Sequence, residues 1–331
     1  MKKINPEEYL NCSRTRDILI KEIGIHYGSD WEIIPLIIAR GISGKIYYVT
    51  DKNNNKSFIL KYIENGDIMK ELELQNIASS INNISPRIVD YWLCSQNSNN
   101  GIIIMEKVGN LTLSEYLNRL NQQTNNDLIS FYKTIQLIRI VYLLILKVYA
   151  LNREGIFHRD LHFDNILVSL DEENIENLNV KNIYIIDFGK SVYWDYMLSP
   201  LYENPDNNIE TLVEYSNKIQ SVFKQLYGDR TMTLEFLNEQ INTPTTNPNL
   251  KSILKLINKL FVTELFGSQM ETLSKLSWDL GTIEEFKDYL DDMIKFDVEE
   301  YIENNINQYI NNDNDIANNL TNDLMDKIFT I

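Results

Sequence analysis

The chain has 331 residues, 44% of them hydrophobic, so it exceeds a usual single domain of roughly 100 to 200 residues. We therefore expect two lobes with a substantial core. The formal net charge of −16 and the isoelectric point near 4.7 repel phosphate backbones and anionic lipid. This charge argues against nucleic acid or a membrane surface as a partner, and it suits a basic protein substrate better.

Cysteine usage and the apolar segments predict where the protein resides. Cys12 and Cys94 are the only cysteines, so we expect no disulfide framework and a reducing, intracellular setting, cytoplasmic or nuclear. If the protein is viral or an effector, that setting is the host cell. The first residues, MKKINPEEYLNCSRTRD, contain no apolar run typical of a signal peptide. The most apolar stretch, Thr134 to Ala150, is short for a membrane span and contains Arg139 and Lys147, which predicts a buried helix.

The first third of the chain changes from helical to strand patterning. Residues 1–30 are predicted to form a helical N-terminal extension. From Glu32 the runs IIPLIIA, KIYYVT and SFILKYI predict three strands joined by hairpins, and IVDYWLCS and GIIIMEKV predict two more. Asp67 to Ser80 has helical spacing between them. Residues 31–108 are thus predicted to be one lobe of five strands and one helix.

The remainder, residues 109–331, is predicted to be a second, mainly helical lobe. TLSEYLNRL predicts a short helix, and a long one follows from about residue 126 to 152, ended by Gly155. A polar loop, HRDLHFDN, leads into a strand pair, ILVSL and NIYIID. Beyond residue 209 the pattern is helical, interrupted by INTPTTNPNL.

Two polar loops carry the strongest chemical signal. HRDLHFDN spans residues 158–165, and DFG spans residues 187–189 at the end of a predicted strand. Phosphoryl transfer needs a carboxylate to orient the attacking hydroxyl and oxygen ligands to hold magnesium. Asp160 would supply the first, and Asn165 and Asp187 the second. A single loop aspartate would more often only bond its own loop, but the two loops together favour catalysis.

HRDLxxxN followed by DFG resembles the eukaryotic protein-kinase superfamily. The resemblance implies a bilobal α+β fold, with a five-stranded antiparallel N-lobe, one αC helix and a mainly helical C-lobe. It also implies ATP and Mg²⁺ as cofactors, with Mn²⁺ as an alternative, and a protein substrate. In this family the strand lysine, here Lys61 in FILKYI, binds phosphates and pairs with a helix glutamate. Glu71 occupies that position, and Glu73 is the fallback.

The nucleotide-binding segments match the superfamily less completely. ARGISGKI aligns with GxGxxGxV through Gly41, Gly44 and Ile46, but has Ala39 at the first glycine. It also mimics the phosphate-binding pattern GxxxxGK[ST], which fails at Ala39 and Ile46. The resemblance further implies a pocket for adenine, whose expected residues are Met105 at its gate, Glu106 to Val108 in the hinge and Leu167 as its floor. Met105 and Leu167 would fit a packed core equally well.

The catalytic loop departs from most members of the superfamily. His162 replaces the usual lysine two residues after the catalytic aspartate, which resembles haspin-like kinases and loosely the HxDxxxxN loop of aminoglycoside and choline phosphotransferases. His162 could donate the corresponding hydrogen bond to the γ-phosphate. Arg159 often accompanies activation by phosphorylation in the family, though constitutive activity fits as well. The candidate phosphorylation sites are Ser191, Tyr193, Tyr196 and Ser199.

The sequence therefore predicts a protein kinase, Ser/Thr-directed, with Asp160 as its base. Two alternatives remain open: a small-molecule kinase of the aminoglycoside and choline type, and a nucleotide-binding pseudokinase scaffold. The last 140 residues match the superfamily poorly, with Glu214 as a suggested replacement for its acidic clamp on the catalytic loop. Oligomeric state is not predicted.

Overall fold

The computed structural model describes residues 31–41, 44–64, 66–94, 99–109, 111–122, 127–171 and 178–193, with Asp229, Glu235, Glu239 and Asn242. The chain divides into two compact units. Unit 1 comprises Met1–Gly109 with Tyr184–Ser191, and unit 2 comprises Asn110–Ile183 with Val192–Ile331. The predicted N-terminal extension, Tyr196, Ser199, Glu214 and the predicted helices beyond residue 209 lie outside the described residues.

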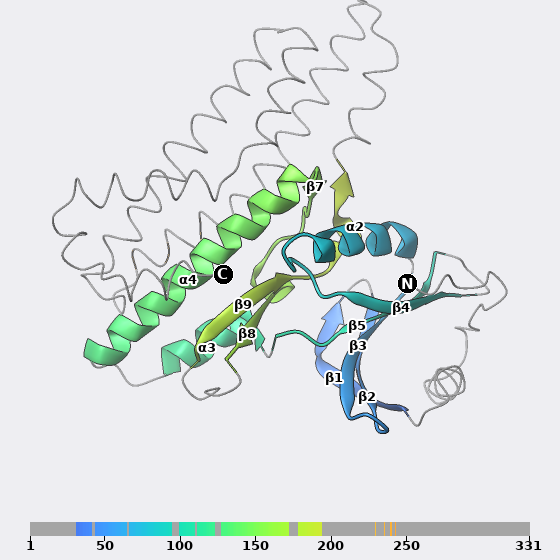
Figure 1. Ribbon diagram of the computed structural model, residues 1–331, viewed down its shortest axis with the longest axis horizontal. Helices are drawn as coiled ribbons and strands as arrows, with labels where there is room; N and C mark the ends of the chain where they lie inside the picture. Colours follow the sequence, from blue (N-terminus) through green and yellow to red (C-terminus); the bar gives the residue numbers. More distant parts are fainter. Residues whose placement is uncertain are drawn as a thin grey trace, which may run out of the picture. The chain divides into compact units, whose positions relative to one another are not determined.

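Unit 1 is built on a five-stranded sheet (Figure 1). Its strands are β1 (Trp31–Gly41), β2 (Gly44–Asp51), β3 (Lys56–Ile63), β4 (Ile88–Leu93) and β5 (Gly101–Glu106). They lie in the order β1-β2-β3-β5-β4, and every neighbouring pair is antiparallel. Valine, isoleucine and aromatic residues dominate these strands, as expected for a pleated sheet with buried faces. The predicted five-stranded antiparallel sheet is confirmed.

Helix α2 (Ile68–Ser80) packs against β4 and β5. It begins at Asp67, whose carboxylate accepts a hydrogen bond from the Lys70 amide at 3.1 Å and caps the helix. Its apolar residues join a cluster on one face of the sheet, which we call the inner face. That cluster consists of Ile63, Ile68, Leu72, Ile88, Ile103 and Met105.

The opposite face of the sheet carries a second apolar cluster, which we call the outer face. Successive strand residues point to opposite sides, so Leu60 and Tyr62 lie on the outer face when Lys61 and Ile63 lie on the inner one. The buried residues of the outer face are Ile33, Val49, Leu60, Tyr62, Trp92, Cys94, Ile102 and Ile104. Both faces of this sheet are therefore apolar and buried.

Unit 2 contains two helices and two small sheets among its described residues. Its elements are β6 (Leu111–Thr112), α3 (Leu113–Gln122), α4 (Asp127–Arg153), β7 (Ile156–Phe157), the 3-10 turn η1 (Phe163–Asn165), β8 (Ile166–Leu170), β10 (Val192–Tyr193) and all but the last two residues of β9 (Val180–Ile185). One sheet has the order β6-β8-β9, and β7 pairs with β10. Gly155, at φ 74°, follows α4 and turns the chain into β7.

Helix α4 is the core helix of unit 2. Its segment Ile135–Arg153 is long and apolar enough to cross a membrane by length and composition, but 89% of it is buried inside the protein. Arg139 donates hydrogen bonds to the carbonyl oxygens of Val180 at 2.8 Å and Lys181 at 3.1 Å. The helix is thereby joined to the β9 strand.

The expectation of no disulfide framework did not anticipate a disulfide at Cys94. Cys94, directly after β4, is disulfide-bonded. The only other cysteine of the sequence is Cys12, which lies outside the described residues. Cysteine count and the assumed reducing compartment could not reveal this bond, because pairing depends on the distance between residues that are far apart in sequence.

Candidate active site

A buried cation and two carboxylates meet on the inner face of unit 1. The ammonium of Lys61, on β3, donates a hydrogen bond to Glu71 of α2 at 2.5 Å and to Asp187 at 2.8 Å. The Lys61 and Glu71 side chains are 8% and 3% exposed, whereas that of Asp187 is 32% exposed. The structure thus brings together three residues that the sequence assigned to nucleotide binding, and Asp187 is the one that solvent can reach.

Glu71, and not the fallback Glu73, is the partner of Lys61. Glu71 is buried, while Glu73 is exposed on the other side of α2. Residues two apart on a helix point in different directions, so only one of the two can face the sheet. The first turn of α2, fixed by the Asp67 cap, determines that Glu71 is the glutamate that faces the sheet.

Electrostatics keep Lys61 charged. Burial lowers the pKa of Lys61, but the carboxylates of Glu71 and Asp187 outweigh it, and the pKa of Lys61 is raised above its usual value. Burial raises the pKa of Glu71, and the ammonium of Lys61 opposes that shift. A charged lysine beside a solvent-accessible carboxylate can bind a phosphate group that enters from solvent.

Asp187 adopts an unusual backbone conformation. Its φ of 67° and ψ of 71° lie in the left-handed region, which residues other than glycine seldom occupy. The following residues form the 3-10 turn η3 (Phe188–Lys190), with Phe188 fully buried and the turn packed against α2. Backbone strain of this kind is held by surrounding contacts and is common where a carboxylate must be aimed at a ligand.

Gln75 is a positioning residue that the sequence did not reveal. It lies one turn after Glu71 on α2, is 2% exposed, and donates from Nε2 to the Pro86 carbonyl oxygen at 3.2 Å and to Met105 Sδ at 3.6 Å. These bonds join α2 to the chain before β4 and to the residue expected at the adenine gate. From helical spacing alone, a single polar residue at this position is predicted to lie on the surface.

The expected phosphate-covering segment is a hairpin between β1 and β2. Gly41 lies opposite Gly44 in the register, and Arg40 lies opposite Lys45. Ala39 is on β1, and Ile46, on β2, lies opposite Lys61 of β3. The segment therefore joins strand to strand, unlike the strand-to-helix turn of a GxxxxGK[ST] phosphate loop.

The expected hinge follows directly from β5. Met105 is buried in the inner-face cluster, and the Glu106 amide donates to the Arg87 carbonyl oxygen at 2.9 Å. The Glu106 side chain accepts from Arg87, with Nε at 3.0 Å and Nη2 at 2.5 Å. Val108 is half-buried, and Gly109 follows at φ 68°. Because Arg87 holds its carboxylate, Glu106 would meet a nucleotide through its backbone.

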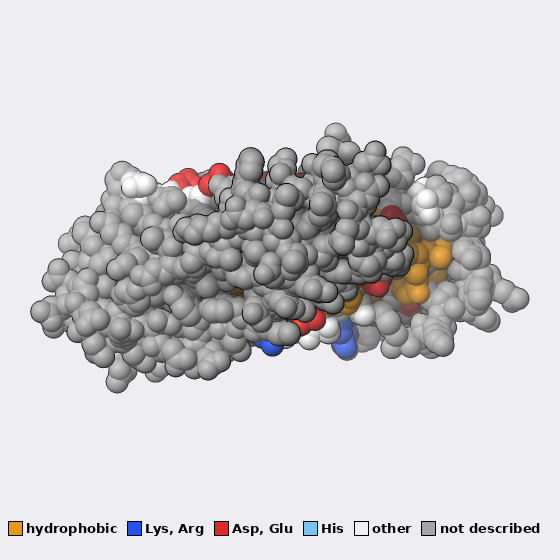
Figure 2. Space-filling model, turned by 90° about the horizontal axis from the view of Figure 1, so that it is seen from above, with side chains coloured by type: hydrophobic (Ala, Val, Ile, Leu, Met, Phe, Trp, Pro, Cys, Tyr) orange, Lys and Arg blue, Asp and Glu red, His pale blue; other side chains and the backbone are white. Residues whose placement is uncertain are grey.

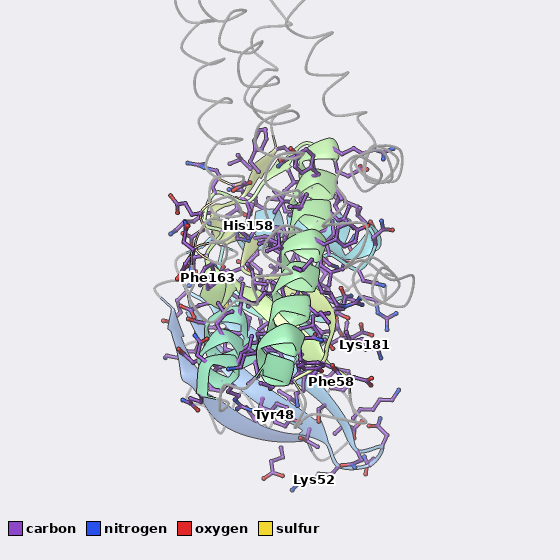
Figure 3. The ribbon with its side chains drawn as sticks, turned by 90° about the vertical axis from the view of Figure 1, so that its left-hand side faces the viewer. Tyr48, Lys52, Phe58, His158, Phe163 and Lys181 are labelled. Carbon is purple, nitrogen blue, oxygen red and sulfur yellow. The ribbon has the colours of Figure 1, made fainter. Side chains whose placement is uncertain are left out.

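A second group of predicted residues lies in unit 2. The loop between β7 and β8 carries Asp160, half-buried, and Asn165, which is 7% exposed. The Asn165 amide Nδ2 donates to the Asp160 carbonyl oxygen at 2.9 Å, and its backbone N–H donates to the His162 carbonyl oxygen at 2.9 Å. With Nδ2 so engaged, the Oδ1 of Asn165 is its remaining acceptor. Figure 3 labels His158, the first residue of this loop, and Phe163, which begins the turn η1 within it.

Asp229 anchors the start of the same loop. Its buried carboxylate accepts from the His158 amide at 2.6 Å and from the Arg159 amide at 2.8 Å. Arg159 has φ 65°, so the clamp holds a residue in the left-handed region. The sequence suggested Glu214 as the acidic residue that holds this loop, but Asp229 is the residue that does so. A bond between residues 70 positions apart leaves no local sequence signal.

The other predicted loop residues have simpler surroundings. His162 is exposed, and Arg159 is exposed through its side chain. Leu167, the expected floor of the adenine pocket, is half-buried on β8 opposite Thr112 of β6. Ser191 is buried and Tyr193 is half-buried, which makes Ser191 a poor phosphorylation site.

The predicted magnesium ligands fit that ion by their chemistry. Mg²⁺ is bound through oxygen, usually by one or two carboxylates together with substrate phosphates and water. Asp187 supplies an accessible carboxylate, and Asn165 supplies an amide oxygen. Among the described residues no group of three or more His, Cys, Asp or Glu could hold a metal alone. Each of these oxygen ligands, taken by itself, suits a metal that arrives with a nucleotide.

Comparison with known proteins supports a relationship to kinases. The Serine/threonine-protein kinase greatwall of Xenopus tropicalis is 29% identical over 158 residues, covering 46% of this chain and 16% of that protein. NUAK family SNF1-like kinase 1 of Mus musculus is 25% identical over 180 residues, covering 51% of this chain and 25% of that protein. The chain thus spans a quarter or less of the length of these curated relatives.

A solved structure is also similar, at low identity. The structure of the Cydia pomonella Granulovirus kinase, PK-1, matches with a TM-score of 0.37 and 18% identity, covering 54% of this chain and 60% of that one. The family described as Protein kinase domain matches residues 36–205, a little over half of the chain. This chain belongs to the protein kinase domain family and has its bilobal α+β fold.

Proposed function

We propose that this protein kinase transfers the γ-phosphate of ATP, bound with Mg²⁺, to a hydroxyl group of a protein. The observation that carries the proposal is the contact of Lys61 with both Glu71 and Asp187 at 2.5 and 2.8 Å. Kinase chemistry requires this lysine–glutamate pair and the metal-binding aspartate to be in place together. A scaffold that had lost catalysis would have no need to keep all three charges.

The loop of unit 2 supplies the remaining roles. Asp160 orients the acceptor hydroxyl and takes its proton, and Asn165 and Asp187 hold the metal, which neutralises charge on the phosphates when bound. Lys61 binds the α- and β-phosphates. Glu71 keeps Lys61 extended toward them, and Asp229 keeps the loop before Asp160 in its left-handed conformation.

Serine or threonine is the proposed acceptor, because the relative greatwall of Xenopus tropicalis is described as a serine/threonine-protein kinase. We also propose that His162 contacts the γ-phosphate, as the resemblance to a haspin-like loop implies. His162 is exposed and therefore accessible for that contact. A small-molecule acceptor is the alternative that the transfer assay distinguishes.

A basic protein substrate is proposed from the net charge of −16. Figure 2 shows acidic side chains of described residues at several places on one face, and basic ones along its lower edge. An intracellular location follows from the use of ATP. In a reducing compartment Cys94 would be a thiol rather than a disulfide.

Binding of nucleotide tests the metal-dependent part of this proposal. Titration of the wild-type protein with ATP, with and without Mg²⁺, is compared with Asp187→Ala and with Asp171→Ala, a control at an exposed aspartate of unit 2. We expect Mg²⁺ to tighten binding at least about tenfold in the wild type and the control, and not in Asp187→Ala. Equal magnesium dependence in all three proteins would remove Asp187 from metal binding.

A further inference from the structure

The hinge residue Lys107 is attached to the sheet of unit 1 by an aromatic ring. Its ammonium lies over the ring of Tyr48, 4.9 Å from the ring centre. Tyr48 is on β2, whereas Lys107 directly follows β5, and β3 lies between these two strands. A cation within about 6 Å of a ring centre is attracted by the negative face of the ring. Lys107 therefore has a partner that lies beyond the neighbouring strand.

The strand register accounts for this contact. Phe58 of β3 and Glu106 of β5 are an end pair of their ladder, so Ser57 and Lys107 are the next residues along the two chains. The Tyr48 hydroxyl donates a hydrogen bond to Ser57 Oγ at 2.5 Å. That hydrogen bond, and then the charge of Lys107, lower the pKa of Tyr48, while partial burial opposes the shift. Tyr48, Ser57 and Lys107 thus form one connected group, which we call the hinge anchor.

The hinge anchor lies on the inner face of the sheet. Tyr47 packs against the outer-face cluster, so Tyr48, next to it on β2, points to the inner face. In the register Tyr48 lies opposite Ile59, and Ile59 lies opposite Met105, the residue expected at the adenine gate. Lys61 is on the same face, two residues further along β3. The anchor is therefore placed beside the segment expected to bind the base, and not beside the cluster expected to bind phosphates.

The residue before Lys107 is held from the other side of β5. Arg87, which precedes β4, donates from Nε to the Glu106 carboxylate at 3.0 Å, and its carbonyl oxygen accepts from the Glu106 amide at 2.9 Å. β5 lies between β4 on one side and β3 and β2 on the other. Two consecutive hinge residues are thus attached in opposite directions, which restrains the backbone between them.

We propose that Tyr48 is a positioning residue for nucleotide binding, because it holds Lys107 and thereby the hinge backbone that meets the adenine base. This inference rests on the proposed function, in which the hinge binds the base of ATP. A segment already held in its bound conformation loses less conformational freedom when its ligand binds. Tyr48 therefore lowers the KM for ATP and takes no part in phosphoryl transfer.

Hydrogen exchange in the nucleotide-free protein tests the anchor itself. Tyr48→Leu and Lys107→Met each remove the contact between cation and ring, whereas Lys107→Arg keeps a cation there. We expect the Glu106 amide to exchange about two- to fivefold faster in the first two variants, as for loss of an exposed cation–π contact, and at the wild-type rate in Lys107→Arg. The double variant Tyr48→Leu/Lys107→Met should exchange no faster than either single variant, because one contact cannot be lost twice.

Two exchange results would overturn the anchor. Unchanged exchange in both single variants would mean that the ring does not hold the hinge. Additive effects in the double variant would mean that Tyr48 and Lys107 act separately. Lys107→Met changes an exposed side chain and decides the first point even if Tyr48→Leu does not fold.

Binding of ATP and of adenosine, which has the base but no phosphate, tests the consequence for the nucleotide. We expect Tyr48→Leu and Lys107→Met to raise the KM for ATP and the Kd for adenosine by the same factor, about two- to fivefold, with kcat unchanged. The matched control, Lys52→Met, removes an exposed lysine at the β2–β3 turn, labelled in Figure 3, and should behave as wild type.

The two ligands separate failure of this inference from failure of the proposed function. Weaker binding of ATP with unchanged binding of adenosine would place the effect at the phosphates and contradict a role in holding the hinge. Unchanged binding of both ligands in the variants would contradict the role of Tyr48 alone. A wild-type protein that binds neither ligand would contradict the proposed function, and this role of Tyr48 with it.

Discussion

At Lys61 a buried cation lies between Glu71 at 2.5 Å and Asp187 at 2.8 Å, so stability and chemistry depend on the same contacts. Removing the lysine leaves the carboxylate of Glu71 buried without its cation. We expect Lys61→Met to lower the free energy of unfolding by about 3 kcal/mol, as for a buried ion pair that loses one partner. Lys56→Met, at an exposed lysine of the same strand, should change it little.

The double variant Lys61→Met/Glu71→Leu separates the two roles of this pair. Replacing both charges with apolar side chains removes the unpaired carboxylate, so denaturant unfolding should show most of the lost stability recovered, while nucleotide binding stays weak. If the double variant were less stable than Lys61→Met alone, the buried-charge explanation would be wrong.

Asp229 acts through the backbone of the catalytic loop. Asp229→Asn keeps one acceptor oxygen but places an amide N–H group against the amide of His158 or Arg159. We expect a loss of about 2 kcal/mol in stability and a fall in kcat larger than any change in KM for ATP, because the loop before Asp160 loses its anchor. Urea unfolding and steady-state kinetics measure the two effects.

Glu235→Gln, at an exposed position near Asp229 in sequence, is the control for that variant and should behave as wild type. Unchanged kcat in Asp229→Asn would show that the clamp does not position Asp160.

Motif spacing could predict Lys61, Asp160, Asn165 and Asp187, because their neighbours in sequence form the motif. Gln75 and Asp229 escaped prediction because their partners lie on other elements.

Among the elements, the long periodic ones were predictable and the short ones were not. The predicted helix from about residue 126 to 152 is observed as Asp127–Arg153, and the predicted Asp67 to Ser80 as Ile68–Ser80 with Asp67 as its cap. Strands β6 and β10 have two residues each, too few for any periodicity, and they form only because β8 and β7 pair with them.

Helix α4 carries a testable pH dependence at Lys147. Burial lowers the pKa of Lys147 from 10.5 to about 8. Between about pH 8 and 10 the unfolded chain holds this proton and the folded chain does not, so stability should rise with pH across that window. Replacing the lysine by methionine should remove the rise and stabilise the protein at pH 7 by up to about 3 kcal/mol, at about 1.4 kcal/mol per pKa unit.

Urea unfolding at pH 7, 8, 9 and 10 measures this effect. Lys181→Met, at the exposed lysine labelled in Figure 3, is the control and should leave the dependence unchanged. A Lys147→Met protein less stable than wild type at pH 7 would show that the ammonium is stabilised in the folded state rather than penalised by burial.

For the whole molecule, sequence pattern predicted the bilobal α+β fold because its first lobe alternates between strand spacing and one helix, and its motifs fall at the loops. It did not predict that both faces of the sheet are buried, or that Cys94 is bonded. Those features depend on which distant segments pack together, which neither periodicity nor composition records.

The net charge of −16 also belongs to the whole molecule. Attraction of a basic acceptor by this charge is screened by salt over about 10 Å at 0.1 M ionic strength. A basic acceptor protein should therefore lose affinity as salt rises, while a neutral acceptor should not.

Transfer of labelled γ-phosphate from ATP, with Mg²⁺ and protein acceptors including the protein itself, is the most direct measurement of the central claim. Wild type and Asp164→Asn, at an exposed aspartate of the same loop, should label protein. Asp160→Asn should bind nucleotide normally and lose transfer at least about 10²-fold, as expected for a lost base. Transfer at near wild-type rates in Asp160→Asn would contradict the role of Asp160 as the base. A wild-type protein that binds ATP and Mg²⁺ but labels no protein would contradict the proposed protein kinase activity.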